Sequence, residues 1–292
     1  MNSQGEQKDL AFVHQMVGQT STISDADFEL YRNWIYQSAG ISLTPTKKAL
    51  VVGRLSSRLR ELGVTTYRDY FEYLTTFTNQ QERKLEQQRV INLLTTNETY
   101  FFREEAHFTY IQHSLFAAWA GQPIRCWSAA SSTGEEAYSL AMLLDSHYPG
   151  RWQIVGTDIN SQVLHIASQG IYPMLRHEHI PQVYLKKYCR KGIGSKQDTL
   201  KIVHSLRSHV KFERANLQRS LDDLGLFDLV FLRNVMIYFD KSTKQRVITN
   251  VASRLKNGGI LLIGHSETLN GLDCNELQLL QPSIYQKRSN AD

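Results

Sequence analysis

The chain has 292 residues, of which 41% are hydrophobic and 21% charged, so it can bury a core and is not disordered by composition. Its length is that of about two ordinary domains. The positive charge is concentrated in two segments. Lys47–Arg60 has five basic residues and no acidic residue, and Val183–Arg214 has nine basic and two acidic residues. Because the whole chain has a net charge of +5, the remaining residues together carry a net charge of −7. This distribution disfavours a uniformly basic nucleic-acid-binding surface.

Other classes of protein are excluded by simple absences. No run of about 18 apolar residues is present, so we expect no membrane-spanning helix. The N-terminus is polar and lacks the apolar stretch of a signal peptide. The cysteines Cys126, Cys189 and Cys274 are odd in number and far apart, which favours neither a disulfide framework nor a metal site. We therefore expect a cytoplasmic protein.

The first part of the chain has helical periodicity. We expect a flexible polar segment over residues 1–22 and a helical domain over residues 23–95. Capping residues, proline at a first turn and glycine after a last turn mark the helix ends. The predicted helices are one starting at Ser24 or Asp25, one from Thr44-Pro45 to Leu62, Tyr67–Thr76 and about Glu82–Leu94.

The second of these helices carries a basic face. Lys47, Arg54 and Arg58 are spaced at i, i+7 and i+11, on a different face from the apolar residues Val51, Leu55, Leu59 and Leu62. Such a face either docks on an acidic partner or is simply solvated.

After about residue 123 the pattern changes to alternating strands and helices. Apolar runs that are too long for one-sided burial predict a parallel sheet covered on both faces, an α/β doubly wound fold. The predicted strands are Ile124–Ser128, Trp152–Gly156, Phe227–Leu232 and Gly259–Ile263, with helices over Gly134–Asp145 and Asn160–Ser168. We also expect a small antiparallel insert near residues 183–214 and a last edge strand around Pro282–Lys287.

Acidic residues follow the first two strands. The loop Trp127–Glu136 is rich in small residues and ends in Glu135 and Glu136, and it lacks the glycine fingerprint that admits a pyrophosphate. Two glutamates suit a cationic ligand, such as a sulfonium or an ammonium. Asp158 lies 24 residues after Gly134, where an acid can bind ribose hydroxyls, or it caps the next helix.

Two further segments combine aromatic and basic residues. Arg233–Asp240 follows a buried strand, where function is found in this architecture, and Thr96–Glu104 has three aromatics before Arg103. Packing roles for both segments stay open. Neither segment contains a histidine or cysteine. The pair His177 and His179 lacks a third ligand of suitable spacing, so we expect no metal.

Together these segments resemble the chemotaxis receptor methyltransferases, the CheR family. The matching stretches are Asn97–Arg103, Ser128–Glu136, Gly156–Asp158, Ala215–Leu217, Arg233–Phe239 and Gly264–Glu267. The resemblance implies a Rossmann-like class I methyltransferase domain dependent on S-adenosylmethionine over residues 123–288. It also implies a small β subdomain inserted at about 172–214, a linker with cofactor-site residues over 96–122, and an all-α N-terminal domain, residues 23–95, that recognises receptors.

The activity that the resemblance implies is protein-glutamate O-methylation, with S-adenosyl-L-homocysteine as the second product. By the same resemblance, Arg103 and Tyr238 orient the reacting groups. The implied cofactor-site residues are Asn97, Thr99, Arg103, Glu135, Asp158, Asn216, Leu217, Arg233 and Asn234. We favour Glu135 over Glu136, and the choice between them stays open. The alternatives are a nucleic-acid methyltransferase of the same fold and a non-catalytic adaptor that senses the cofactor.

The resemblance also gives the basic segments candidate partners. Lys47, Arg54 and Arg58 would bind the cytoplasmic helical domain of a chemotaxis receptor, whose methylation helices are acidic. Arg190–Gly194 resembles the region of the β subdomain that binds a receptor C-terminal peptide by strand addition. The following Ser195–Thr199 lacks a glycine expected in peptide binders, so tethering stays open. We expect a monomer without nucleic-acid partners or membrane insertion.

Overall fold

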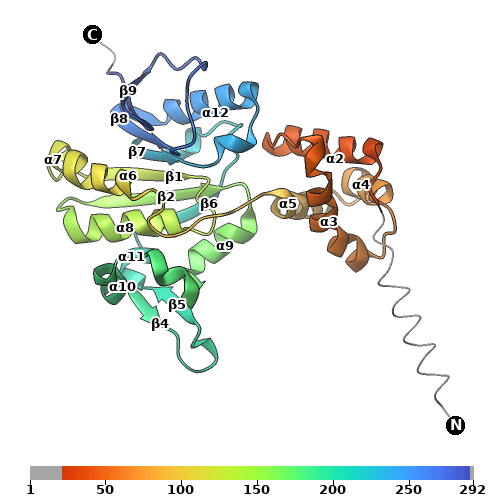
Figure 1. Ribbon diagram of the computed structural model, residues 1–292, viewed down its shortest axis with the longest axis horizontal. Coiled ribbons are helices and arrows are strands. Elements are labelled where there is room, and N and C mark those ends of the chain that lie inside the picture. The colour runs from red at the N-terminus through yellow and green to blue at the C-terminus, as the bar shows by residue number, and fades with distance from the viewer. Residues whose placement is uncertain (1–21, 290–292) are drawn as a thin grey trace. The chain divides into compact units, whose positions relative to one another are not determined.

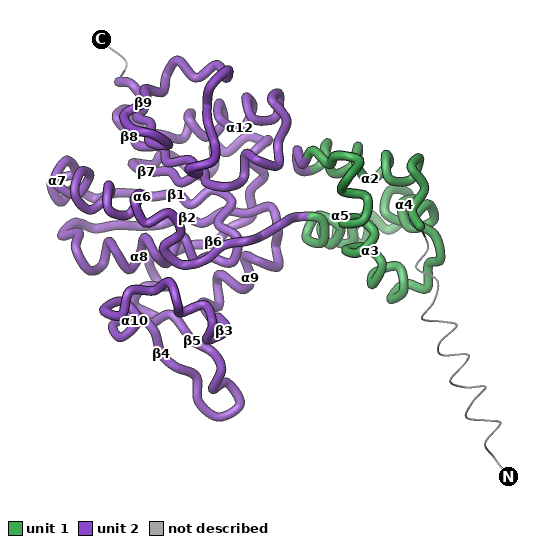
Figure 2. Tube along the Cα trace, in the orientation of Figure 1, with its two compact units in different colours: residues 1–38, 42–94 green, residues 39–41, 95–292 purple. Residues whose placement is uncertain are grey.

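The computed structural model describes residues 22–289 (Figure 1). The predicted flexible segment, residues 1–22, lies outside this range except for its last position. The chain forms two compact units (Figure 2): one extends through Ser38 and from Ser42 to Leu94, and the other comprises Ala39–Ile41 and the chain from Thr95 onward.

The first unit is helical, as predicted. Its elements are α2 (Asp25–Ala39), η1 (Pro45–Lys47), α3 (Lys48–Leu62), α4 (Tyr67–Thr76) and α5 (Gln80–Leu94). The Ser24 hydroxyl caps α2 by accepting the Asp27 N–H at 3.0 Å. Thr44 does not cap in this way, because its hydroxyl bonds to that of Thr46 at 2.7 Å. Gly63 ends α3 with a φ of +67°.

A buried ion pair joins two helices of this unit. The α3 residues Val51, Leu55 and Leu59 are buried, as their spacing predicts. Arg58 on the same helix reaches both carboxylate oxygens of Glu86 on α5, at 2.8 and 2.7 Å. The Tyr70 hydroxyl on α4 donates to Glu86 at 2.6 Å. The carboxylate therefore links three helices.

The second unit is built on a seven-stranded sheet, and the predicted α/β class is confirmed. In spatial order the strands are β6 (Val210–Arg214), β2 (Trp152–Asp158), β1 (Ile124–Ala129), β7 (Phe227–Leu232), β8 (Leu255–Ile263), β10 (Ile284–Lys287) and β9 (Leu277–Gln281). The first five are mutually parallel, so their carboxyl ends share one edge. The order reverses between β1 and β7, where doubly wound sheets bind ligands.

Both faces of this sheet are buried. One face packs against α8 (Glu135–His147), α6 (Glu105–Tyr110) and η2 (Ile111–Leu115), and the other against α12 (Lys241–Ser253). Side chains alternate between the faces: on β1, Cys126 belongs to the first cluster and Trp127 to the second. The remaining helices that flank the sheet are α7 (Phe116–Trp119) and α9 (Ser161–Gln169).

The insert between α9 and β6 is a small β subdomain. Its elements are β3 (Ile171–Pro173), η3 (Met174–His179), α10 (Gln182–Tyr188), β4 (Cys189–Lys191), η4 (Gly194–Lys196), β5 (Thr199–Ile202) and α11 (His204–Arg207). The strands form an antiparallel sheet in the order β3-β5-β4. Val210–Arg214, which we expected within the insert, pair instead with β2 in the main sheet.

The end of the chain differs from the prediction. The strand expected at the edge, β10, pairs on both sides, antiparallel to β8 and to β9. The strand at this edge is β9, which was not predicted because the adjacent leucines Leu279 and Leu280 interrupt any alternation of apolar and polar residues.

Candidate active site

The loop after β1 turns back onto the end of β2. Ala130 and Ser132 have positive φ values of 61° and 50°, and Gly134 has 92°. The Ser132 N–H donates to Asp158 Oδ2 at 2.9 Å. A Cβ on Gly134 would lie 2.8 Å from that of Ala167, so both its φ and its packing require glycine.

Asp158 is buried at the carboxyl end of β2. Its second oxygen accepts the Asn160 N–H at 2.9 Å, and burial raises the pKa of its carboxyl. The alternative that Asp158 caps α9 is wrong, because Asn160 supplies the cap by accepting from the N–H groups of Gln162 and Val163. Asp158 instead joins the two loops at this edge of the sheet.

The linker contacts the same loops. The Ser132 hydroxyl donates to the Asn97 carbonyl at 2.9 Å. Thr95 accepts hydrogen bonds from the amides of Asn97 and Asn160, at 3.3 and 2.8 Å. On the other side of Asp158, its carbonyl accepts the Ala215 N–H at 3.1 Å, which places Asn216 and the buried Leu217 beside β2.

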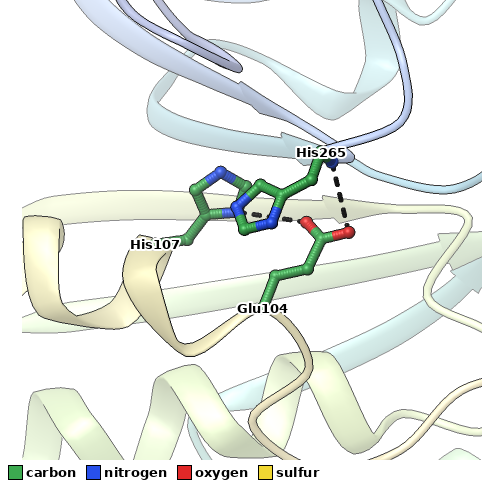
Figure 3. A group of neighbouring side chains, drawn as sticks. All are labelled: Glu104, His107 and His265. Carbon is green, nitrogen blue, oxygen red and sulfur yellow. Dashed lines mark hydrogen bonds and ion pairs between the residues drawn. The ribbon is translucent and has the colours of Figure 1, made fainter.

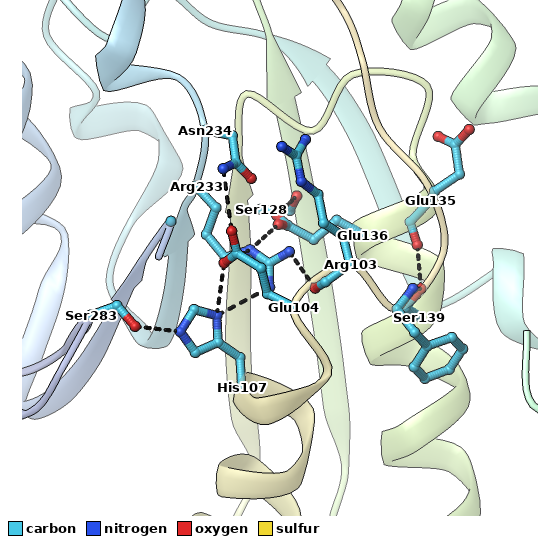
Figure 4. A network of polar contacts seen from close by, with 12 residues as sticks. Arg103, Glu104, His107, Ser128, Glu135, Glu136, Ser139, Arg233, Asn234 and Ser283 are labelled. Atoms are coloured by element: carbon cyan, nitrogen blue, oxygen red, sulfur yellow. Dashed lines mark hydrogen bonds and ion pairs between the residues drawn. The ribbon is translucent and has the colours of Figure 1, made fainter. Parts of the chain in front are cut away.

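The two glutamates at the start of α8 have different partners. Glu136 accepts from the Ser128 hydroxyl at 2.6 Å and lies 3.0 Å from Arg233 Nε. Glu135 accepts from the Thr133 hydroxyl at 2.5 Å. Burial raises the pKa of both carboxyls. Figure 4 shows the Glu135 carboxylate pointing away from the network that holds Glu136.

Arg233, directly after β7, lies inside the protein. Its side chain is 1% exposed, and in addition to its ion pair with Glu136 it donates to His107 Nδ1 at 3.1 Å and to the Arg103 carbonyl at 2.6 Å. Two aromatic rings flank it, those of Phe108 and Phe231. A role for Arg233 in cofactor binding stays a prediction; in this structure its guanidinium contacts protein groups.

Glu104, His107 and His265 resemble a metal-binding group, since each offers a ligand atom within 4.8 Å of the others (Figure 3). An arginine cannot accept a hydrogen bond, so the Nδ1 lone pair of His107 is taken by Arg233. Nε2–H then donates to Ser283 at 2.8 Å. Burial and the charge of Arg233 lower the pKa of His107 to about 3. The arrangement holds a neutral histidine in a hydrogen-bond network and suits no metal.

The loop after Arg233 is held by a carboxylate that sequence reasoning gave no role. Glu267 accepts from the N–H groups of Asn234, Met236 and Gly264, at 2.8, 2.8 and 2.9 Å. Asn234 has a φ of 57°, and its amide donates to Glu104 at 3.3 Å. Tyr238 follows in η6 (Met236–Tyr238) and is half-buried.

Arg103 lies in the linker, and its side chain contacts other linker residues. Its Nη1 donates to the Glu98 carbonyl at 3.1 Å, and its guanidinium lies 5.6 Å from the ring centroid of Tyr100. The Thr99 carbonyl accepts from Arg176 of η3, a residue that sequence reasoning missed because its partners lie about 40 and 77 positions away.

The predicted site residues therefore fall in two groups. Those assigned to the cofactor and the reaction come from the linker and from the loops after β1, β2, β6 and β7, at one edge of the sheet. Lys47, Arg54 and Arg58 belong to the helical unit. Lys47 is exposed, Arg54 donates to the Leu94 carbonyl at 2.9 Å, and Arg58 is held by Glu86.

The sheet is parallel and doubly wound, with the antiparallel strand β10 between β8 and β9, and acidic residues follow β1 and β2. This is the architecture of class I S-adenosylmethionine-dependent methyltransferases. Residues 97–283 match the family described as CheR methyltransferase, SAM binding domain, and residues 26–95 match the CheR methyltransferase all-alpha domain. The chain belongs to the CheR methyltransferase family, and its cofactor is S-adenosylmethionine.

Curated relatives extend the likeness over nearly the whole chain. The chemotaxis protein methyltransferase of Salmonella typhimurium is 37% identical over 91% of this chain and 92% of its own. That of Escherichia coli is 40% identical over 86% and 87%. Among solved structures, a glycopeptide N-methyltransferase complexed with sinefungin covers 59% of this chain and 53% of its own, at 14% identity and a TM-score of 0.35, too distant to carry an argument.

From its family and these relatives, the chain is a methyltransferase of the chemotaxis type. Within residues 22–289, no helix is both long enough and apolar enough to cross a membrane.

Proposed function

We propose that this protein methylates glutamate side chains of chemotaxis receptors, forming glutamate methyl esters and S-adenosylhomocysteine. The observation that carries the proposal is the alignment with chemotaxis methyltransferases over more than four-fifths of each chain, helical unit included. A receptor-recognition role for the helical unit rests on the same alignment.

The methyl transfer depends on the correct orientation of the two reactants more than on proton transfer. A glutamate oxygen attacks the methyl carbon in line with the carbon–sulfur bond, whose electrons pass to sulfur as the sulfonium becomes a neutral thioether. Glutamate is already ionised at neutral pH, so no base is required. In support, the buried His107 in this region has a pKa of about 3 and both ring nitrogens engaged. Proximity and exclusion of water supply the rate.

Distinct residues would hold the two reactants. In our proposal Asn97, Thr99, Asp158, Asn216, Leu217 and Asn234 line the cofactor, with Glu135 facing its cationic part. The choice of Glu135 is supported by the engagement of Glu136 with Arg233 and Ser128. Arg103 would steer a carboxylate, and Tyr238 would present its hydroxyl and ring toward the sulfonium. Arg233 would act through the Arg103 carbonyl that it holds.

Two surfaces would bind the receptor. Lys47, the last residue of η1, is exposed and suited to an acidic receptor helix, whereas Arg58 on α3 already has Glu86 and Glu61 as partners. On the β subdomain, β4 lies at a sheet edge and Arg190 and Lys191 are exposed there, which suits strand addition by a receptor tail.

The test is transfer of labelled methyl from S-adenosylmethionine to membranes that contain the organism's own receptors. We expect label in the receptor band that is released as methanol by mild base, the mark of an ester. Label in added RNA or DNA would favour a nucleic-acid methyltransferase. Cofactor binding without label in any acceptor would favour the adaptor.

A further inference from the structure

The β subdomain contacts four consecutive residues of the linker, each through a different side chain. The pairs are Thr99 with Arg176, Tyr100 with His179, Phe101 with Tyr172 and Phe102 with Tyr184. The three aromatic pairs have ring centroids 4.6, 5.1 and 5.4 Å apart. This stretch lies between Asn97 and Arg103, so the subdomain holds the part of the linker that enters the active site.

Arg176 differs from the other three contacts because it reaches a second element. Its Nη1 donates to the Thr99 carbonyl and also lies 3.7 Å from Glu135 Oε1 on α8. One guanidinium therefore contacts both the linker and the first residue of α8, and these two segments meet at the same edge of the sheet.

The charge of Arg176 is one of the influences that act on the pKa of Glu135. Its side chain is 1% exposed, and the side chains that face it are Thr133, Tyr172 and Arg176. The Tyr172 hydroxyl donates to the Thr133 carbonyl at 2.8 Å, which fixes the loop. Burial raises the pKa of Glu135, while the Thr133 hydroxyl, a backbone hydrogen bond and, least of these, the charge of Arg176 oppose that rise. Arg176 thus favours the ionised carboxylate.

We propose that Arg176 is a positioning residue that holds Thr99 and Glu135 in the arrangement that binds S-adenosylmethionine, which makes the β subdomain a structural part of the cofactor site. The inference rests on the proposed roles of Thr99 and Glu135. It assigns to the subdomain a role that is independent of any receptor tail.

The experiment is calorimetry of S-adenosylhomocysteine binding to the full chain. We expect Arg176→Gln to weaken binding about tenfold, since the hydrogen bond from a charged guanidinium to the Thr99 carbonyl is lost. Arg176→Lys should recover part of the affinity because it keeps the charge near Glu135. Lys186→Gln, an exposed change on α10 of the same subdomain, is the matched control and should bind as the unchanged protein does.

The pH dependence separates positioning from general damage to the fold. Affinity should decline as pH falls and Glu135 takes up a proton. Without the charge of Arg176 the pKa of Glu135 is higher, so in Arg176→Gln the decline should begin at a higher pH. A purely structural defect would lower affinity by the same factor at every pH.

Unchanged affinity and an unchanged pH profile in Arg176→Gln would overturn the proposal. If that variant does not fold, Arg176→Lys decides: full affinity with the profile of the unchanged protein also overturns it. The measurement needs no receptor, so failure of receptor methylation would refute the proposed function alone. Normal binding by Glu135→Gln would refute the premise about Glu135.

Discussion

Each unit of the chain has an arginine–glutamate pair with one buried partner, but the two pairs are built differently. In the helical unit, Arg58 binds both oxygens of Glu86 and joins regular helices. In the α/β unit, Arg233 makes one close contact with Glu136 and turns its other nitrogens to His107 and to the Arg103 carbonyl.

The backbone around the two pairs also differs. Near Arg233, Phe102, Glu104 and Asn234 have positive φ values of 53°, 57° and 57°. Such conformations are costly for residues other than glycine and persist where the surroundings hold them. No non-glycine residue of the described helical unit has one. The same kind of ion pair therefore stabilises regular structure in one unit and irregular backbone beside the candidate active site in the other.

The largest expected effect is that of Arg233→Ala. The change leaves Glu136 buried without its cation and the Arg103 carbonyl without its donor, and breaking a buried pair costs about 3–5 kcal/mol. Urea denaturation should show this loss. Because Arg103 would no longer be held, calorimetry should also show weaker binding of S-adenosylhomocysteine.

Arg233→Lys sharpens the same test. It keeps a charge near Glu136 but cannot make the remaining contacts together, so both losses should be intermediate. If Arg233→Ala lowers stability and leaves cofactor affinity intact, the Arg233 network supports the fold only, and the contrast with Arg58 disappears.

Arg58→Ala should have a smaller effect, confined to stability. It leaves Glu86 buried and costs about 3 kcal/mol in urea denaturation, while binding of S-adenosylhomocysteine should not change. Lys47→Glu is the matched change at an exposed residue directly before α3: we expect normal stability and reduced receptor methylation at low salt. Weakened cofactor binding in Arg58→Ala would contradict the comparison.

Much of the fold follows from local sequence patterns. Helix ends at Ser24 and Gly63 and the buried strand Phe227–Leu232 are set by capping, glycine and apolar runs, all readable within a few residues. The edge strand β9 was missed, since its pairing with β10 and not its own pattern makes it a strand.

That the candidate-site residues meet at one edge of the sheet was predictable, but their contacts with one another were not. Acids and aromatics after parallel strands must meet at one edge of the sheet, which brings Asp158 and Arg233 to the same region. The orientation of Arg233 depends on Arg103 and His107, about 130 positions earlier. Such long-range partners leave no signal in one sequence, and the same holds for the separate directions of Glu135 and Glu136.

Tyr238→Phe should affect the reaction and leave cofactor binding nearly unchanged. If the hydroxyl orients the sulfonium or the attacking carboxylate, its loss should lower turnover about tenfold, the value of a hydrogen bond made in the transition state. Methyl incorporation at saturating cofactor and calorimetry with S-adenosylhomocysteine separate the two quantities. Normal turnover would refute the role of the hydroxyl.

The smallest effect concerns the stability of the Arg233 network as a function of pH. The pKa of His107 is about 3 in the folded protein, against an ordinary 6.5. Between these values the unfolded chain binds a proton that the folded chain does not. The free energy of unfolding is therefore highest above about pH 6.5 and declines as pH falls toward 3.

His107→Gln keeps an acceptor for Arg233 and a donor for Ser283 and does not titrate. From pH 7.5 to 5.5, the midpoint of thermal unfolding should therefore fall about 2–4 °C less in this variant than in the unchanged protein. Equal falls in the two proteins would mean that His107 titrates normally, so that its contact with Arg233 does not keep it neutral.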